Sequence, residues 1–440
     1  MNGVADYIVS GIGSGFYEAA KKGSQVQDVV FSIRLALERG LDTHSGASVS
    51  QADLLKFYDN LDPLRVAAFL EHVVSTGSEQ PGTSIVDVTT TLVCMHVLPT
   101  VQLSVGDSNA TMPDRRLGML TGSASAAASG RLPPADLALN RMPIWQTLHL
   151  GLETVPGGPG LCLMTFVDNF VTLGPDARTN AVLLEDAELY LKKNWGLQYG
   201  HDSRQCLPCK GAPPATFPSD PERWPVRDTM KCLGCIFQRS GRSNRCVQDA
   251  LDRAHRAVML NLGKGLLQAG RPAKAKFLKT CVRSILSWRW ASWPYLAHTA
   301  KVLEGFQRDL CSLLWRVTPQ PGESYLAAMT RQHSDSKLVA RELGDWSDSW
   351  AVGVAGWHNH VVRNTASSFC LPLLRWNGQS WIQQQRQNFE DMFPSLASTA
   401  RTITRTRLTQ GRPPKRWQAC AERAGEIAVA MGYEPLLPTT

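Results

Sequence analysis

The stretch LCLMTFVDNFVTL, residues 161–173, decides the fold because two apolar runs flank a single polar turn. Leu161 to Val167 is apolar, Asp168-Asn169 has the chemistry of a tight turn, and Phe170 to Leu173 resumes the apolar run. This pattern predicts a β-hairpin with an acidic side chain at its turn. An aspartate in such a place is usually only a turn residue, so its neighbours must decide its role.

A second predicted strand, Val49 to Leu54, carries Asp53 near its end. Carboxylates held at the ends of adjacent strands make a hard-oxygen site that suits two Mg²⁺ ions. Such a site can activate a primer 3′-hydroxyl and stabilise the leaving pyrophosphate. Asp53 and Asp168 are therefore candidate catalytic and metal-binding residues, with Asn169 as a weakened second position at the turn.

The remaining pattern is mainly helical. Apolar residues at helical spacing predict a helix that Ser24 caps and Gly40 closes, and Asp62-Pro63 begins another that reaches Gly77. A further helix is expected from about Asn180 to Trp195. Two longer regions, residues 247–315 and the Trp-rich stretch after residues 319–322, also have helical patterns. Strands near the centre and helices towards the C-terminus together indicate a mixed fold.

The order of these segments resembles the motifs of non-LTR (LINE-like) retrotransposon reverse transcriptases. Residues 52–59, ADLLKFYD, resemble the first palm motif, in which an aromatic steric gate follows the aspartate by five residues. Here the aspartate is Asp53 and the gate is Tyr58. Residues 166–169, FVDN, resemble the aromatic-x-Asp-Asp hairpin, with Asn169 in the second acidic position.

Residues 118–123, GMLTGS, are similar to the second palm motif, a glycine-spaced loop that approaches template and nucleotide. The resemblance implies that Gly122 and Ser123 position these ligands, although Thr121 stands where the family usually has glutamine. Residues 196–204 resemble the fourth motif, with Ser203 where a lysine is common.

Three further segments extend the resemblance over most of the chain. Residues 231–234, KCLG, resemble the Leu-Gly primer-grip hairpin. Trp357, His360 and Arg363 follow the W-x-x-H-x-x-R pattern of many non-LTR elements, and residues 411–417, GRPPKRW, match the closing G-R-P-x-x-R-W stretch.

The resemblance implies an α+β right-hand polymerase with an antiparallel palm sheet, partial fingers, an α-helical thumb and a helical C-terminal region. The expected divisions are fingers and palm in residues 1–240, a basic thumb in 241–320, and a Trp-rich region with a basic tail in 321–440. The implied activity is RNA-directed DNA synthesis with two Mg²⁺ ions, an RNA template, a DNA primer and deoxynucleoside triphosphates. Tyr58 would exclude the ribose 2′-hydroxyl.

Departures from the family pattern leave other interpretations open. Asn169 removes one negative charge from the metal site. The basic fingers segment would lie upstream of Met1, so an N-terminally truncated core is expected, and no endonuclease domain is visible. One alternative is a catalytically silent relic that keeps the palm fold and binds nucleic acid. Another is a nucleic-acid-binding module stabilised by zinc.

Cysteine spacing supplies the zinc hypothesis. Two CxxC pairs, separated by 22 residues, come near the spacing of a zinc ribbon: Cys206, Cys209, Cys232 and Cys235. Both pairs overlap the strands expected for the fourth and fifth motifs, so four cysteines acting as small apolar side chains are the alternative.

The positive charge is concentrated in two segments. The chain has a formal net charge of +8, and residues 236–300 hold twelve Lys or Arg against only Asp249 and Asp252. Residues 401–417 hold six basic residues and no acid. This distribution suits a phosphate backbone, with solvated helix faces as the alternative. Trp288, Trp290 and Trp293 lie within the basic region and could stack on bases, but at least two are expected in the core.

The composition also narrows the class of protein. With 43% hydrophobic and 19% charged residues, the chain is globular in character, and its most apolar stretch, residues 83–105, contains Asp87, His96 and Pro99. A membrane span and a secretory signal are therefore not expected. Eleven scattered cysteines favour a reducing, intracellular compartment, without distinguishing nucleus from cytoplasm.

Overall fold

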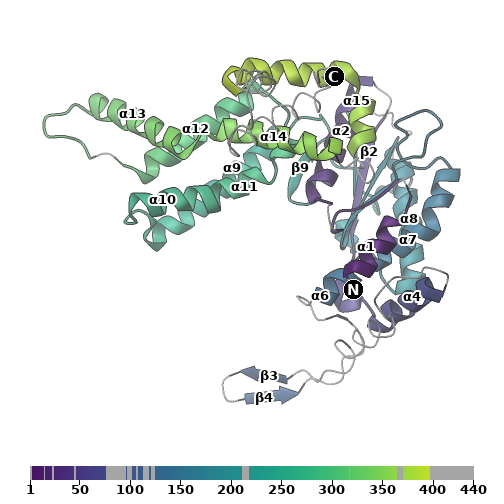
Figure 1. Ribbon diagram of the computed structural model, residues 1–440. Coiled ribbons are helices and arrows are strands. Elements are labelled where there is room, and N and C mark those ends of the chain that lie inside the picture. Colours follow the sequence, from purple (N-terminus) through teal and green to yellow (C-terminus); the bar gives the residue numbers. More distant parts are fainter. Residues whose placement is uncertain are drawn as a thin grey trace, which may run out of the picture. The chain divides into compact units, whose positions relative to one another are not determined.

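The hairpin predicted within residues 161–173 lies at the centre of a sheet in the computed structural model (Figure 1). Strands β5 (Leu163–Phe166) and β6 (Asn169–Gly174) pair antiparallel, with Phe166 opposite Asn169. The turn therefore consists of Val167 and Asp168, one residue earlier than the predicted Asp168-Asn169 turn.

Three more strands complete a five-stranded sheet in the order β1-β5-β6-β2-β7. The predicted strand near Val49 is β2 (Ser48–Asp53), which pairs antiparallel with β6 on one side and with β7 (Gln205–Pro208) on the other. At the far edge, β1 (Phe16–Glu18) pairs parallel with β5. The sheet is thus antiparallel except at one edge.

The structure describes residues 2–13, 15–21, 24–43, 46–75, 96, 102–105, 108–111, 118–119, 124–210, 218–316, 318–363 and 370–396. The chain divides into two units, residues 1–233 and 234–440. The regions expected as thumb and C-terminal region both belong to the second unit.

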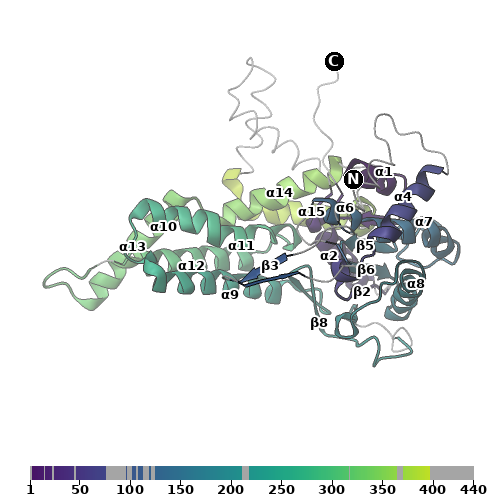
Figure 2. The same ribbon diagram turned by 90° about the horizontal axis from the view of Figure 1, so that it is seen from below.

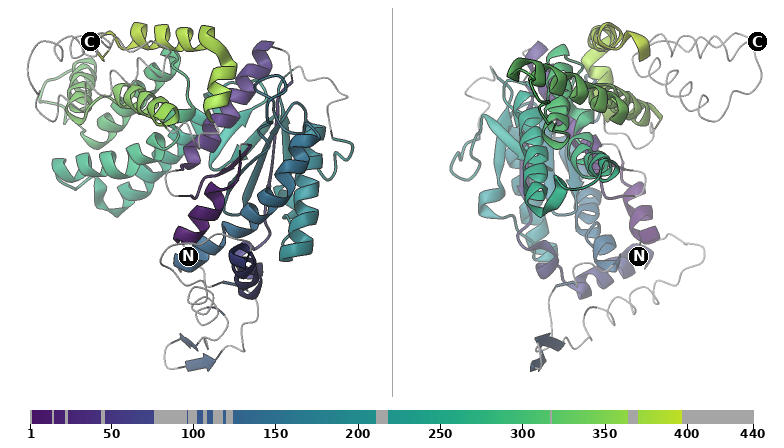
Figure 3. Two further views of the ribbon diagram at one scale, coloured as in Figure 1. Left: turned by 45° about the vertical axis from the view of Figure 1, so that its right-hand side comes forward. Right: turned by 90° about the vertical axis from the view of Figure 1, so that its left-hand side faces the viewer.

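Helices of the first unit surround the sheet: α1 (Asn2–Ser10), α2 (Val26–Thr43), α3 (Phe57–Asn60), α4 (Pro63–Ser75), α6 (Ala124–Ser129), α7 (Leu132–Thr147) and α8 (Ala177–Trp195). Shorter elements are β3 (Gln102–Val105), β4 (Ser108–Thr111), a 3₁₀ turn (His201–Ser203) and β8 (Thr229–Cys232). Helices α7 and α8 cover one face of the sheet and α2 covers the other (Figure 3).

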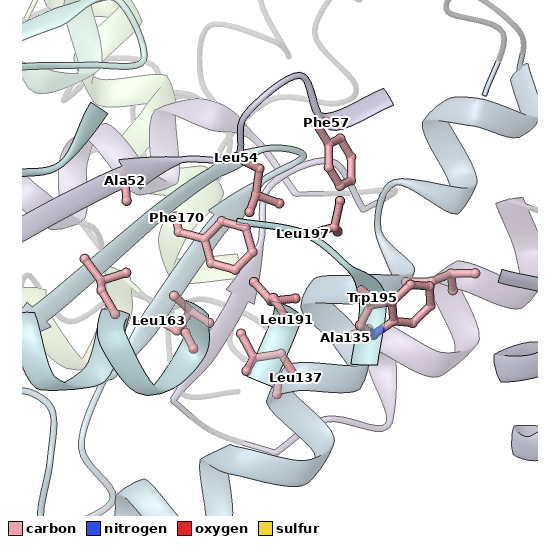
Figure 4. Close-up of a cluster of buried hydrophobic side chains, with 14 of the residues drawn as sticks. Ala52, Leu54, Phe57, Ala135, Leu137, Leu163, Phe170, Leu191, Trp195 and Leu197 are labelled. Atoms are coloured by element: carbon pink, nitrogen blue, oxygen red, sulfur yellow. The ribbon is translucent and has the colours of Figure 1, made fainter. Parts of the chain in front are cut away.

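The main hydrophobic core lies between the sheet and helices α7 and α8. Figure 4 shows Leu163 and Phe170 of the sheet close to Leu137 of α7 and Leu191 of α8. All four side chains are completely buried. This packing explains why the hairpin strands are apolar on both faces, because α2 buries the opposite side.

Two predicted helix boundaries can be compared with the structure. Pro63 begins α4 as predicted, but Gly40 does not end α2, which continues to Thr43. A Cβ on Gly40 would lie 2.7 Å from Cβ of Ala47 and 3.2 Å from Sγ of Cys209. The glycine therefore permits close packing within the helix rather than terminating it.

The described part of the second unit is mainly helical, as the pattern predicted. Its elements are β9 (Cys235–Gln238), α9 (Asn244–Asn261), α10 (Arg271–Phe277), α11 (Arg283–Ser287), α12 (Ala297–Leu314), α13 (Tyr325–Leu343), α14 (Trp346–Arg363) and α15 (Cys370–Met392). Figure 2 shows α12 running alongside α13. One-turn π-helices, Leu262–Leu266 and Leu278–Val282, interrupt the basic region.

Aromatic residues form the core of this second unit. Trp346 and Trp350 are buried, and the Trp350 ring lies 5.8 Å from that of Tyr295 and 6.1 Å from that of Phe393. Trp290 and Trp293 are also buried, which confirms that at least two tryptophans of the basic region are core residues.

Together the units confirm the predicted α+β class, with an antiparallel sheet in one unit and helices in the other. Among the described residues, no helix is long and apolar enough to cross a membrane.

Candidate functional site

Strand pairing brings Asp53 and Asp168 together at one end of the sheet. Asp53 is the last residue of β2 and lies opposite Asn169, the first residue of β6. The Leu54 N–H donates to the Asp168 carbonyl over 2.9 Å, so the backbone of the turn is fixed against the end of β2. Asp53 therefore ends a strand beside the turn that carries Asp168.

The Asp53 carboxylate is partly buried and incompletely satisfied. Its Oδ1 atom is inaccessible to solvent and has no hydrogen-bond partner. Burial, followed by the charge of Asp168, raises the pKa of Asp53 to about 6. A buried oxygen without a donor, beside a second carboxylate, is a suitable ligand for a hard divalent cation.

Asn169 contacts Asp168 rather than only replacing an acid. Burial raises the pKa of Asp168, while hydrogen bonds from its own backbone and from the Asn169 side chain oppose the rise. The Asn169 side chain therefore favours the charged form of the carboxylate next to it. Among the described residues, no three His, Cys, Asp or Glu side chains converge. A cation bound here would need further oxygen ligands from water or substrate.

The turn that carries Asp168 has unusual backbone geometry. Val167 has φ of +59°, a left-handed conformation that is a genuine outlier for a β-branched residue. Such strain persists only where the surroundings hold it, and it is frequent at functional sites.

Tyr58, the predicted steric gate, lies close to the same turn. It belongs to the short helix α3, which begins after Lys56 in a left-handed conformation (φ +43°). Burial raises the pKa of the Tyr58 phenol, and the charges of Asp168 and Glu18 add to this effect. The left-handed residue after β2 thus turns the chain so that the Tyr58 ring lies near the carboxylates of Asp168 and Glu18.

The region of the second motif also approaches Tyr58. The Met119 N–H donates to the Tyr58 carbonyl over 2.7 Å. A Cβ on Gly130 would lie 3.4 Å from Oη of Tyr58 and 3.0 Å from Cε1 of Phe57, so a larger residue would crowd the gate. The absence of a side chain at Gly130 therefore permits close packing against Phe57 and Tyr58. Thr121, Gly122 and Ser123 lie outside the described residues.

Ser203 of the fourth motif stabilises the backbone of Asp53. Its Oγ accepts from the Asp53 N–H at 2.9 Å and lies 3.1 Å from the Asp53 carbonyl. The Gly200 N–H also donates to that carbonyl, at 2.9 Å. The serine, noted only as a departure from lysine, thus anchors the end of β2.

A third carboxylate, Glu18, was not among the residues selected from sequence. It ends β1 and is only 2% exposed. Burial raises the pKa of Glu18 to about 7, against hydrogen bonds from Thr165, Ala20 and Val167 and the charge of Arg131. A three-residue strand in a Gly-rich segment gave no periodic signal that could have identified it.

The four cysteines of the zinc hypothesis are completely buried, at 0–2% exposure: Cys206, Cys209, Cys232 and Cys235. Three of them lie in the first unit, and among the described residues no three potential metal ligands converge. The Cys206 thiol accepts from Ser50 Oγ at 2.9 Å, and burial raises the pKa of Cys206 to about 12. They behave as small apolar side chains.

The primer-grip resemblance falls on a genuine turn. Leu233 and Gly234, between β8 and β9, have φ of +46° and +76°. Positive φ at both central residues is the geometry of a type I′ hairpin turn. The sequence prediction of a hairpin at KCLG is therefore confirmed.

Basic side chains of the predicted thumb divide into two groups. Arg289 is 2% exposed, lies 3.6 Å from an Asp249 carboxylate oxygen and packs over the Trp288 ring at 5.5 Å. It is therefore part of the core. A second group is exposed to solvent: Arg242, Arg245, Arg256, Lys264, Lys276 and Lys279.

The two C-terminal motifs have different outcomes. Trp357, His360 and Arg363 all lie in α14, and Trp357 is buried. The GRPPKRW stretch, residues 411–417, lies outside the described residues.

Comparisons with known proteins do not assign the chain to a family. No family profile and no curated protein matches its sequence. Three similar solved structures are telomerases. The Candida albicans enzyme with a TWJ fragment of telomeric RNA has 11% identity and a TM-score of 0.40, and covers 89% of this chain and 57% of its own. The Candida tropicalis enzyme with a TWJ fragment of telomeric RNA has 11% identity and a TM-score of 0.39. The match covers 83% of this chain and 53% of that one.

The third is apo telomerase of Candida tropicalis truncated from its C-terminal domain, with 13% identity, a TM-score of 0.36, and coverage of 48% of this chain and 38% of that one. The chain thus spans about half the length of these telomerases or less. At these identities and scores the likeness carries no argument about activity.

Proposed function

We propose that the chain is the polymerase core of a reverse transcriptase of the retrotransposon kind, extending a DNA primer on an RNA template. The observation that carries the proposal is the site at the end of the sheet. There Asp53, with a buried and unpartnered oxygen at the end of β2, lies beside the turn that carries Asp168 and near Tyr58. The motif order of the sequence gives each of these residues a role in nucleotidyl transfer.

The residues divide the work between cation binding and nucleotide selection. Asp53 and Asp168 would hold Mg²⁺, which when bound lowers the pKa of the primer hydroxyl and neutralises charge on the phosphates. The strained turn and the Ser203 bonds to Asp53 preorganise these carboxylates before substrate arrives. Tyr58 would lie under the sugar, where its ring excludes a 2′-hydroxyl.

Primer extension by the purified full chain, with an RNA template and Mg²⁺, tests this proposal. We expect extension by the native chain and its loss in Asp53→Asn and Asp168→Asn. Asp202→Asn removes a fully exposed carboxylate from the neighbouring 3₁₀ turn and should leave extension unchanged. Extension that persists without Asp168 would show that the active site lies elsewhere.

A catalytically silent relic is the second candidate, and Asn169 favours it. A neutral amide beside Asp168 supplies none of the negative charge that would offset a bound cation. A chain that binds primer–template tightly but gives no extension, even with Asn169→Asp, would support this candidate.

A further inference from the structure

Glu18 connects the edge strand β1 to the turn that carries Asp168. Its Oε2 accepts from the Thr165 hydroxyl at 2.6 Å, and its Oε1 accepts from the Ala20 N–H at 2.8 Å. Thr165 is also its register partner in the parallel β1–β5 pair. One buried side chain therefore contacts the strand that leads into the Val167–Asp168 turn.

This contact is placed where the backbone needs support. Val167 adopts φ of +59°, which for a non-glycine residue is strained and requires compensation from surrounding contacts. The Leu54 N–H bond to the Asp168 carbonyl holds one side of the turn. Without the Glu18 contact to Thr165 on the other side, the turn would relax to a less strained backbone and redirect Asp168.

We propose that Glu18 is a positioning residue, which holds the Val167–Asp168 turn so that the Asp168 carboxylate points into the cation site. The proposal rests on the cation-binding role proposed for Asp53 and Asp168. Glu18 is assigned this role rather than that of a ligand because both of its carboxylate oxygens already accept hydrogen bonds, from Thr165 and Ala20. It acts through hydrogen bonds to the backbone and to Thr165.

Hydrogen–deuterium exchange of the metal-free full chain tests the structural part of the proposal. Glu18→Gln has the same shape, but its amide nitrogen cannot accept, so the donor at Thr165 or at Ala20 loses its partner. We expect faster exchange in the peptide that covers residues 163–170. Thr165→Val removes one donor only and should produce a smaller effect in the same peptide.

Mn²⁺ binding, measured by its paramagnetic signal, tests the functional part. Loss of a partner that orients a metal ligand typically lowers affinity by about 10–100-fold, and we expect this for Glu18→Gln. Val167→Gly in the same chain should restore most of the affinity, since glycine adopts positive φ without strain. A role of Glu18 in overall folding alone would not be rescued by a glycine in the turn.

Asp136→Asn is the matched control. Asp136 is also a partly buried carboxylate, and it accepts from Tyr190 Oη at 3.0 Å and Trp195 Nε1 at 2.8 Å, away from the turn. It should leave exchange in residues 163–170 and Mn²⁺ affinity unchanged.

The outcomes separate this inference from the proposed function. If native chain binds Mn²⁺ no better than Asp168→Asn, the cation site is wrong, and exchange alone then decides whether Glu18 holds the turn. Unchanged exchange and affinity in Glu18→Gln would overturn the inference. So would an equal loss of affinity in Asp136→Asn, or failure of Val167→Gly to rescue.

Discussion

At the scale of single residues, the site depends on how charge is distributed around Asp168. Asn169 contributes a neutral amide instead of a second negative charge, while Asp53 and Glu18 have raised pKa values because they are buried. Metal-free protein tolerates this arrangement because the amide adds no further charge beside Asp168. A cation would instead favour more negative charge at the turn.

Asn169→Asp should therefore increase primer extension, by about one to three orders of magnitude, because it adds a charge that stabilises bound Mg²⁺ and the transition state. The measurement is the extension rate at saturating primer–template and several Mg²⁺ concentrations. Asn194→Asp adds the same charge at an exposed position of α8 and should have no effect. Equal rates for Asn169→Asp and native chain would contradict the assigned role of position 169.

Asp53→Asn should stabilise the metal-free protein while abolishing cation binding. Burial and Asp168 raise the pKa of Asp53 from 3.8 to about 6, so between these values the folded state binds more protons than the unfolded chain. Stability then falls as pH rises from about 4 to about 6 and remains lower above that window. The variant lacks this loss, so its gain in melting temperature should be larger at pH 7.5 than at pH 5, on the order of a few degrees.

Melting in EDTA at both pH values measures the gain, and added Mg²⁺ should then raise the melting temperature of native chain only. Asp202→Asn, at an exposed position, should melt like native chain. A gain for Asp53→Asn that is equal at both pH values would contradict the raised pKa as its cause.

At the scale of elements, local pattern predicted much of the first unit. The hairpin, β2, the start of α4 at Pro63 and most of α8 follow from apolar periodicity and turn chemistry within short windows. The proximity of Asp53 and Asp168 also follows, because both were assigned to ends of strands that pair.

Features that depend on distant pairing could not be predicted. Glu18 is separated from Thr165 by 147 residues and Ser203 from Asp53 by 150, and neither contact leaves a periodic signal. A glycine after an apolar periodic run usually marks a helix end, but position 40 requires glycine because the helix packs closely against Ala47 there. Sequence also shows the charge of Arg289 but not its burial.

Helix α8 supports the sheet from one side, and its N-terminal cap is a separate test of this unit. Asp176 accepts from the Thr179 N–H at 2.7 Å and from its hydroxyl at 3.1 Å. Asp176→Ala should lower the free energy of unfolding by about 1 kcal/mol, whereas Asp176→Asn retains a capping acceptor and should lower it less. Urea titration should show a lower midpoint with an unchanged slope. Equal midpoints for the alanine variant and native chain would mean that the cap contributes nothing.

At the scale of the whole molecule, the two units carry different parts of the proposed activity. The first contains the carboxylates and the gate, and the second contains the exposed basic side chains of α9 to α11. Arg289 is buried and cannot contact a phosphate, so fewer basic side chains are available for binding than the sequence suggested. Arg253 lies 2.9 Å from Asp249, which partly neutralises its charge. Binding should then depend on a definable set of exposed residues.

Affinity for an RNA–DNA duplex should fall steeply with salt, and four exposed residues should account for much of the slope: Arg242, Arg245, Lys276 and Lys279. On duplex DNA each neutralised phosphate contributes about 0.9 to the slope of log affinity against log salt concentration. Replacing all four by glutamine should therefore reduce the slope by up to about 3.6, measured by fluorescence anisotropy of the full chain. Lys192→Gln with Lys193→Gln removes exposed charge from the C-terminus of α8 in the first unit and should leave the slope unchanged.

If affinity barely changes between low and moderate salt, or if both variants reduce the slope equally per charge, the basic residues of the second unit are only a solvated helix surface. The phosphate contacts would then have to come from another part of the chain.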